Sequence, residues 1–258
     1  MHNFPSHEGL PPLEWRKKAR PDVELYDTIH FVEGGVTSAS MVAGGFEATL
    51  SSGRVLRFKK IILAHGILDS LPSIPGLKEL WGKSVFHCPF CHGYESRGKR
   101  IGLIADGPQA MHLIPMLFGL SSDLVVFANG KSQLGAEQRE MLQRRSVRLV
   151  EKSVERIAHQ DLRLQGVVVG GKLVERDAVV TVGQLPYQMK STVGESLGCE
   201  KTDTGLYKVG EGNRTTVPGV YAAGDIMTTQ QTVLGAAASG QAAGIAAVQD
   251  LSKEAFAA

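Results

Sequence analysis

The stretch 99–130 constrains the fold more than any other part of this chain. It reads as a strand from Ile101 to Ala105, a helix from about Pro108 to Gly119, and a second strand from Asp123 to Ala128. A strand, a helix and a strand at this spacing form a βαβ unit, whose two strands lie parallel in one sheet. The sequence therefore predicts an α/β protein with a buried parallel sheet.

The turn inside this unit reads Ala105-Asp106-Gly107-Pro108-Gln109-Ala110. It matches the dinucleotide-binding fingerprint with alanine in place of the first glycine, and with alanine at the last position, which the pattern allows. Gly107 stands where the backbone approaches a pyrophosphate at the helix N-terminus. An ordinary tight turn is an equal alternative. The following Asn129-Gly130-Lys131 offers one lysine and no acid, which slightly favours NADP over NAD.

Residues 87–95 carry the redox signal, His87-Cys88-Pro89-Phe90-Cys91-His92-Gly93-Tyr94-Glu95. Two residues between the thiols let one turn hold both sulfurs within bonding distance, so that the pair can cycle between dithiol and disulfide. A neighbouring imidazole can move the proton that this cycle needs. A zinc site is the alternative, with His87 and His92 as further ligands. The third cysteine, Cys199, reads as a small buried hydrophobic residue.

Composition narrows the class of protein. The chain has 258 residues, 43% of them apolar, and a formal charge of +2 with no long run of either sign, so we expect neither nucleic-acid binding nor attraction to a membrane surface. Only one tight cysteine pair, and no secretory signal at the start, favour a cytoplasmic location. No run of about 18 apolar residues predicts a membrane span.

Two further regions give the remaining architecture. Residues 12–20 read as a helix, and short runs between 30 and 58, beginning with His30–Val32, read as strands of a β-meander before a buried strand that ends at Gly66. Near the end of the chain, residues 217–225 form an apolar strand that ends in Gly224-Asp225. A helix rich in small residues follows from Leu234 to about Leu251. An aspartate delivered to a helix N-terminus suits a hydroxylated cofactor chain.

Taken together, these residues resemble the thioredoxin reductase family of flavoprotein disulfide oxidoreductases over essentially the whole chain. The most specific pieces are Cys88-Pro89-Phe90-Cys91 and Tyr221-Ala222-Ala223-Gly224-Asp225. Within the family, residues 87–95 are most similar to the gliotoxin-type branch, which oxidises dithiols in small molecules. The resemblance implies a two-domain FAD/NAD(P)-binding Rossmann-like α/β fold, with the NAD(P) domain at 79–204 inserted into a FAD domain formed by 1–78 and 205–258.

The resemblance also implies roles for individual residues. Cys91 would be the flavin-proximal sulfur, Cys88 the exchanging sulfur, and His92 the acid/base group. The residues expected to bind FAD are Asn3, Gly66, Gly224, Asp225, Gln231, Thr232 and Val233. Those expected to bind NADP or NAD are Ala105, Gly107 and Ala110. The partner would be a small dithiol or disulfide, or a thioredoxin-like protein, and the assembly a homodimer.

One departure from the family divides the functional hypotheses. Family members begin with a strand, a Gly-x-Gly-x-x-Gly turn and a helix that hold the ADP half of FAD, and this sequence starts after that unit. We therefore expect an N-terminally truncated FAD domain with weakened cofactor affinity. The leading hypothesis is a flavin-dependent thiol–disulfide oxidoreductase. The second is a non-redox relative that acts as a binding or scaffold protein or as a cofactor-free enzyme, and the third is a zinc protein.

Overall fold

The protein, in a computed structural model that describes residues 1–183 and 185–257, forms two compact units. Unit 1 consists of residues 1–70 and the described residues from 185 onward, and unit 2 is the continuous stretch 71–183. The sequence placed the domain boundaries at 78/79 and 204/205. Residues 185–204 lie with unit 1 because Met189, Val193 and Leu197 belong to the hydrophobic core that contains Val220.

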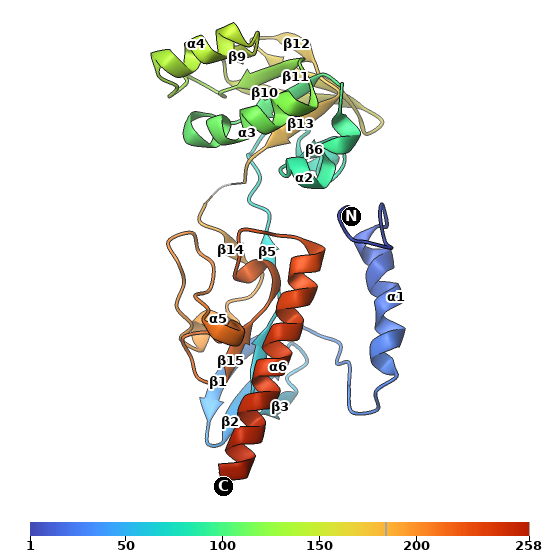
Figure 1. Cartoon of the computed structure of the whole chain (residues 1–258), viewed down its shortest axis with the longest axis vertical. Coiled ribbons are helices and arrows are strands. Elements are labelled where there is room, and N and C mark those ends of the chain that lie inside the picture. The colour runs from blue at the N-terminus through green and yellow to red at the C-terminus, as the bar shows by residue number, and fades with distance from the viewer. Residues whose placement is uncertain (184, 258) are drawn as a thin grey trace. The chain divides into compact units, whose positions relative to one another are not determined.

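Unit 2, coloured from turquoise to gold in Figure 1, is built on a five-stranded parallel sheet in the order β6-β13-β7-β8-β9. Every residue of β7, β8 and β13 is buried, as expected for strands that are covered on both faces. The strands are β6 (Val85–Phe86), β7 (Ile101–Ile104), β8 (Leu124–Phe127), β9 (Arg148–Val150) and β13 (Ala178–Thr181). The helices of this unit are α2 (Pro89–His92), α3 (Gly107–Leu120) and α4 (Ala136–Arg144), with 3₁₀ turns η1 (Lys78–Leu80) and η2 (Tyr94–Ser96).

Two hydrophobic cores cover the two faces of this sheet. On one face, Leu113 and Leu117 of α3 pack with Leu103 of β7. On the other, Val125 of β8 packs with Val167 from an antiparallel sheet. That sheet has the order β10-β11-β12, with β10 (Val154–Gln160), β11 (Arg163–Val169) and β12 (Lys172–Glu175). The predicted βαβ unit and the α/β class are confirmed by β7, α3 and β8.

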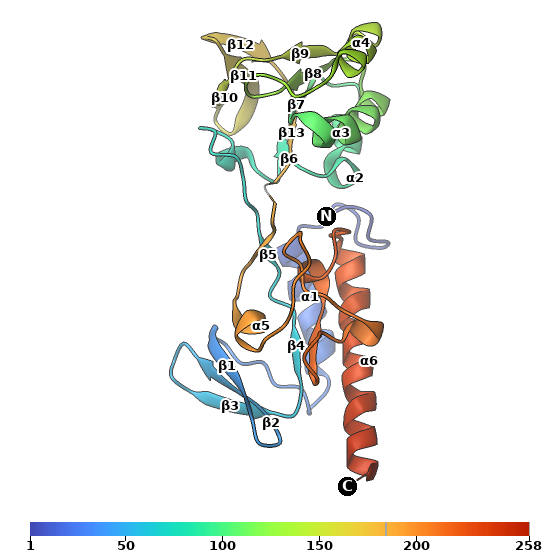
Figure 2. The ribbon, with the colours of Figure 1, turned by 90° about the vertical axis from the view of Figure 1, so that its left-hand side faces the viewer.

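Unit 1 contains the predicted β-meander. Its antiparallel strands follow the order β1-β2-β3, with β1 (Val36–Val42), β2 (Gly45–Leu50) and β3 (Val55–Phe58) (Figure 2). The prediction of a strand at His30–Val32 is wrong, because these residues are exposed and outside any ladder. Phe31 is instead covered by the guanidinium of Arg20, 4.2 Å from the ring centroid. A cation over an aromatic face shields part of the ring from water without a partner strand.

The centre of unit 1 is a parallel pair of strands beside a long helix. β4 (Ile61–Leu63) pairs with β15 (Val220–Ala222), and Leu63 lies opposite Ala222. Ala243, Ala246 and Ala247 of α6 (Val233–Ala257) are buried against β15 and the residue that follows it (Figure 1). Short side chains let the helix axis approach the strand closely, which explains the alanine-rich composition of α6. The remaining elements are α1 (Pro12–Glu24), β5 (Ile67–Leu68), β14 (Gln188–Met189), α5 (Val193–Ser196), η3 (Glu211–Asn213) and η4 (Gly224–Ile226).

Candidate functional site

The redox motif lies at the start of α2 in unit 2. Cys88 and Cys91 form a disulfide, and their Cα atoms are 5.3 Å apart. Cys88 is the residue before the helix, and its carbonyl accepts the amide hydrogens of Cys91 (3.1 Å) and His92 (3.2 Å). Pro89 occupies the first helical position, where a missing N–H costs nothing. One turn of helix thus brings the two sulfurs together, and both cysteines are half-buried.

Aromatic rings hold the two imidazoles that flank the motif. His92 stacks on Phe86 of β6, with ring centroids 5.4 Å apart and planes 27° apart. His87 stacks on Trp81, with centroids 5.5 Å apart and planes 22° apart. Sequence reasoning missed Phe86 and Trp81, since no local signal shows that a ring lies under a histidine that is six residues away. Stacking fixes the plane of each imidazole beside the disulfide.

The zinc alternative conflicts with the state of the thiols. Both sulfurs of Cys88 and Cys91 are used in the disulfide, and a zinc site needs thiolates. Among the residues that the structure describes, no group of three or more histidine, cysteine or acidic side chains is arranged to hold a metal ion.

The predicted dinucleotide turn between β7 and α3 has the backbone of a tight strand-to-helix turn. Gly107 has φ +56°, in the left-handed region that favours glycine, and a Cβ there would lie in ordinary contact with the Gln133 side chain, 3.7 Å from its Oε1 atom. Ala110, in the first turn of α3, is fully buried, and Ala105 is 8% exposed. These three predicted residues therefore form one compact turn, and its helix N-terminus is the kind of place where a pyrophosphate binds.

A carboxylate lies beside that helix N-terminus, on Asp106, the residue that precedes α3. Asp106 accepts hydrogen bonds from the Ser132 hydroxyl (2.6 Å) and the Gln133 amide (2.7 Å). Burial by itself raises the pKa of Asp106, but bonds from Ser132, Gln133 and Gly107 outweigh it and hold the pKa below its usual value. An ionised carboxylate repels a pyrophosphate at the same amides. The turn in this arrangement does not fit a pyridine dinucleotide. The sequence itself offered a sign of this misfit, because the fingerprint contains an acidic residue, Asp106.

In unit 1, the carboxyl ends of β4 and β15 bring together most of the residues predicted to bind the flavin. Gly66 (φ +74°) follows β4, and Gly224 (φ +76°) follows β15 and begins η4, which contains Asp225. Gln231 and Thr232 lead into α6, whose first residue is Val233. Ligands of parallel α/β sheets bind outside the carboxyl ends of the strands. The topology therefore places these residues where a cofactor would bind.

Two orphaned polar atoms support a cofactor at this end of unit 1. The side-chain nitrogen Nε2 of Gln231 is buried and has no hydrogen-bond partner in the described structure, and the same holds for Nε2 of His65. A buried polar atom without a partner is costly unless a ligand supplies one. Thr232 is engaged, since its hydroxyl accepts the Gly235 amide (3.0 Å) near the start of α6. These residues fit a group that offers hydrogen-bonding atoms, such as a flavin.

Asn3 lies in a loop at the N-terminus that is held by its own bonds. Asn3 adopts φ +62°, and its backbone N–H donates a hydrogen bond to the Glu8 carboxylate (3.1 Å). Phe4 packs edge-on against Trp15 of α1, with centroids 5.6 Å apart. The bonds of this loop account for its shape, and a contact of Asn3 with a flavin stays a prediction.

Known proteins are similar to this chain over both of its units. The sequence pattern of the family described as pyridine nucleotide-disulphide oxidoreductase matches residues 17–244. Thioredoxin reductase tcpT of Claviceps purpurea is 32% identical over 259 residues, which cover 95% of this chain and 79% of that protein. Thioredoxin reductase aclD of Aspergillus oryzae is 31% identical, with 87% of this chain and 75% of that protein covered. The crystal structure of an oxidoreductase from Agrobacterium tumefaciens aligns with a TM-score of 0.88 at 35% identity, covering 97% of this chain and 84% of that one. The matched range contains the disulfide and both candidate cofactor turns.

Proposed function

On the premise that the chain belongs to the pyridine nucleotide-disulphide oxidoreductase family, as a thioredoxin reductase-like member, we propose that it is a flavin-dependent thiol–disulfide oxidoreductase. The observation that carries the proposal is the Cys88–Cys91 disulfide at the start of α2. A redox pair of this kind has no structural loop to close, because only two residues separate the cysteines.

The chemistry at the disulfide is an exchange with a dithiol. A substrate thiolate attacks Cys88, the S–S bond breaks, and Cys91 leaves as a thiolate. The second substrate thiolate then attacks the mixed disulfide and releases Cys88. The substrate leaves as a disulfide, and two electrons reside on the reduced Cys88 and Cys91 pair. We propose that His92 accepts and donates the protons that move in these steps. It directly follows Cys91 in the sequence, and stacking on Phe86 holds its ring in place.

A flavin, when bound, supplies a two-electron acceptor for the reduced cysteine pair. Unit 1 would hold the flavin, and the proposed binding residues are Gly66, Gly224, Asp225, Gln231, Thr232, Val233 and Asn3. The buried donor of Gln231 is the structural feature in favour of this binding. Members of the family use pyridine nucleotides as a class, yet the Asp106 carboxylate lies beside the predicted pyrophosphate position, bonded to Ser132 and Gln133. No step of the proposed exchange at the disulfide involves a pyridine nucleotide.

The substrate proposed here is a small dithiol, or its disulfide in the reverse direction. A thioredoxin-like protein is the second candidate, and the names of the relatives favour it. A homodimer and a cytoplasmic location stay predictions. None of the helices in the described residues is both long and apolar enough to span a bilayer. The family match disfavours the non-redox scaffold hypothesis.

The test uses the full chain purified with added FAD. We expect saturable binding of FAD in a fluorescence titration, and a small dithiol to be oxidised under air while FAD is present. Cys88→Ser and Cys91→Ser should each reduce turnover to background, while the matched control Cys199→Ser, which changes a cysteine outside the disulfide, should not. Turnover that persists in Cys88→Ser, with folding shown by circular dichroism, contradicts the proposal.

A further inference from the structure

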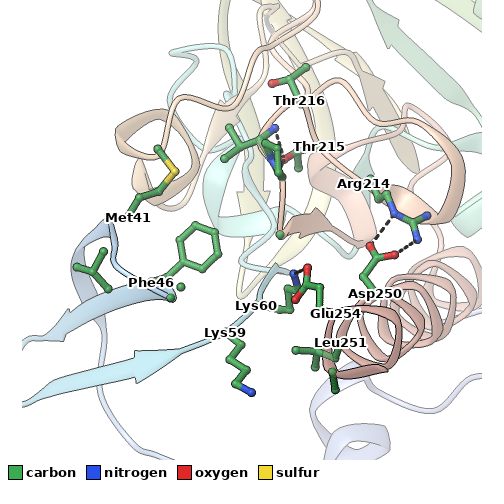
Figure 3. Close-up of a pocket in the computed structure, with 17 residues that line it drawn as sticks. Met41, Phe46, Lys59, Lys60, Arg214, Thr215, Thr216, Asp250, Leu251 and Glu254 are labelled. Carbon is green, nitrogen blue, oxygen red and sulfur yellow. Dashed lines mark hydrogen bonds and ion pairs between the residues drawn. The ribbon is translucent and has the colours of Figure 1, made fainter. Parts of the chain in front are cut away.

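Unit 1 has a cavity of about 780 Å³ at the end of the sheet opposite to the candidate flavin residues (Figure 3). Its walls come from the turn before β4, the loop before β15, the β1–β2 hairpin and the last turns of α6. Because β4 and β15 are parallel, the residues before both strands meet at one end and Gly66 and Gly224 meet at the other. About 26 Å of helix separates Val233, where α6 begins, from Asp250 beside the cavity. The cavity is therefore a separate site.

Apolar side chains form one part of the cavity wall, beside charged and hydroxyl groups. Phe46 of β2 forms one side and is 4% exposed, while Met41 near the end of β1 is 65% exposed. Leu251 of α6 lines the opposite side (Figure 3). The loop wall is tight, since a Cβ on Gly219 would come within 3.1 Å of the Phe46 ring. An exposed methionine beside a packed aromatic wall is an apolar surface that a ligand can cover.

The charges at the cavity leave one cation uncompensated. Arg214 holds Asp250 through two bonds of 2.9 and 2.8 Å, and Lys60 pairs with Glu254 (Figure 3). Lys59 has neither a hydrogen bond nor an ion pair from its ammonium to any residue in the described chain. Three cations and two carboxylates thus line the cavity, and both carboxylates are already engaged. A ligand with a negative group gains attraction from Lys59, and a positively charged ligand is repelled by it.

We propose that this cavity binds a small anionic amphiphile, an apolar body that carries one carboxylate or phosphate. The apolar body covers Met41, Phe46 and Leu251, and the anionic head pairs with Lys59. The volume lies within the range of ligand pockets, roughly 300 to 1,000 Å³. This inference is independent of the proposed redox function, because the site uses none of the cysteine or flavin residues.

The first test measures binding to the full-length protein by isothermal titration calorimetry. The probes are dodecanoate, dodecyl phosphate, dodecanol and dodecylammonium, each below its micelle concentration. We expect saturable one-to-one binding of the two anions, and affinity weaker by about fivefold for the alcohol, as for loss of a partly exposed ion pair. The difference in affinity between dodecanoate and dodecyl phosphate identifies the preferred head group. Equal binding of anion and alcohol, or no saturable binding of any probe, overturns the proposal.

Variants locate the site. Lys59→Glu should abolish the preference for anions, whereas Lys172→Glu, an equal charge change on an exposed strand of unit 2, should leave it unchanged. Ala255→Trp should block all the probes by filling the space at the end of α6. The circular dichroism spectrum and thermal transition of Lys59→Glu should equal those of the wild type, which shows that the variant is folded. If Lys59→Glu does not fold, a photoreactive dodecanoate on the wild-type protein should label the segments 41–46 or 250–255. Labelling elsewhere contradicts the site.

Discussion

Individual residues decide which cofactor chemistry this scaffold can accept. Asp106 and Gly107 are neighbours in the fingerprint, yet they act in opposite directions. Gly107 supplies the left-handed backbone that the turn needs, and Asp106 places an anion beside the start of α3, where it accepts the amide of Gln133. The hydrogen bonds of Asp106 come from residues 26 and 27 positions later in the chain. The repulsion of a pyrophosphate thus depends on a tertiary contact.

Replacing Asp106 with glycine should increase the affinity for NADPH. The change removes a negative charge from the helix N-terminus and frees the amides of Gly107 and Gln133, and we expect a gain of about tenfold. Fluorescence titration with NADPH measures it. Asp161→Asn, which removes a charge from an exposed turn of unit 2, serves as the control and should change nothing. Equal affinity of Asp106→Gly and the wild type would show that the carboxylate does not block the site.

At the scale of elements, ion pairs join the ends of strands that are distant in the sequence. Arg100 precedes β7 and Asp177 precedes β13, and two side-chain bonds of 2.9 and 2.7 Å connect them. The Arg100 guanidinium lowers the pKa of Asp177 to about 2, against the opposing effect of burial. The pair thereby helps to align the starts of two neighbouring parallel strands, whose register sets Ala178 opposite Ile101.

Asp177→Asn should destabilise the protein in a way that depends on pH. The folded pKa of about 2 lies below the unfolded value of about 3.9, so the stabilisation is complete above pH 4 and disappears as the pH falls through 2. Solvent screening of this partly exposed pair reduces its contribution to about 1 kcal/mol. Urea unfolding of both proteins should show this difference at pH 6 and a smaller one at pH 3. A difference that does not depend on pH would assign the effect to packing.

At the scale of the whole molecule, the chain leaves unit 1 once and returns to it once. Unit 2 is continuous in sequence and contains two hydrophobic cores of its own, one on each face of its sheet. Unit 1 needs both of its segments, because β4 comes from the first and β15 from the second. Unit 2 can therefore be produced as one continuous fragment, whereas unit 1 needs two separate segments of the chain.

A fragment of residues 71–183 should fold alone. We expect a cooperative thermal transition and a retained Cys88–Cys91 disulfide, since every strand of the parallel sheet lies in this fragment. Differential scanning calorimetry and thiol titration before and after reduction test this. A matched fragment of residues 1–70, which lacks β15, should show no such transition. A fragment 71–183 without a cooperative transition would mean that unit 2 depends on unit 1.

The sequence by itself determined the parts of this protein that depend on local pattern. Buried apolar runs and a helical period predicted β7, α3 and β8, and the spacing of Cys88 and Cys91 predicted a redox pair. The family prediction from residues 87–95 and 221–225 is confirmed by the match over residues 17–244. These features can be read locally because strand periodicity, turn chemistry and thiol spacing act within a few residues.

Only the tertiary structure decided which residues contact these locally predicted features. His30–Val32 has the composition of a strand but no strand beside it, so Arg20 covers Phe31 instead. The hydrogen bonds that hold the Asp106 carboxylate beside the start of α3 require Ser132 to lie next to it, and the cavity around Lys59 requires α6 to end beside the β1–β2 hairpin. Such contacts join residues far apart in the chain, and their energies depend on burial and distance that no sequence spacing specifies.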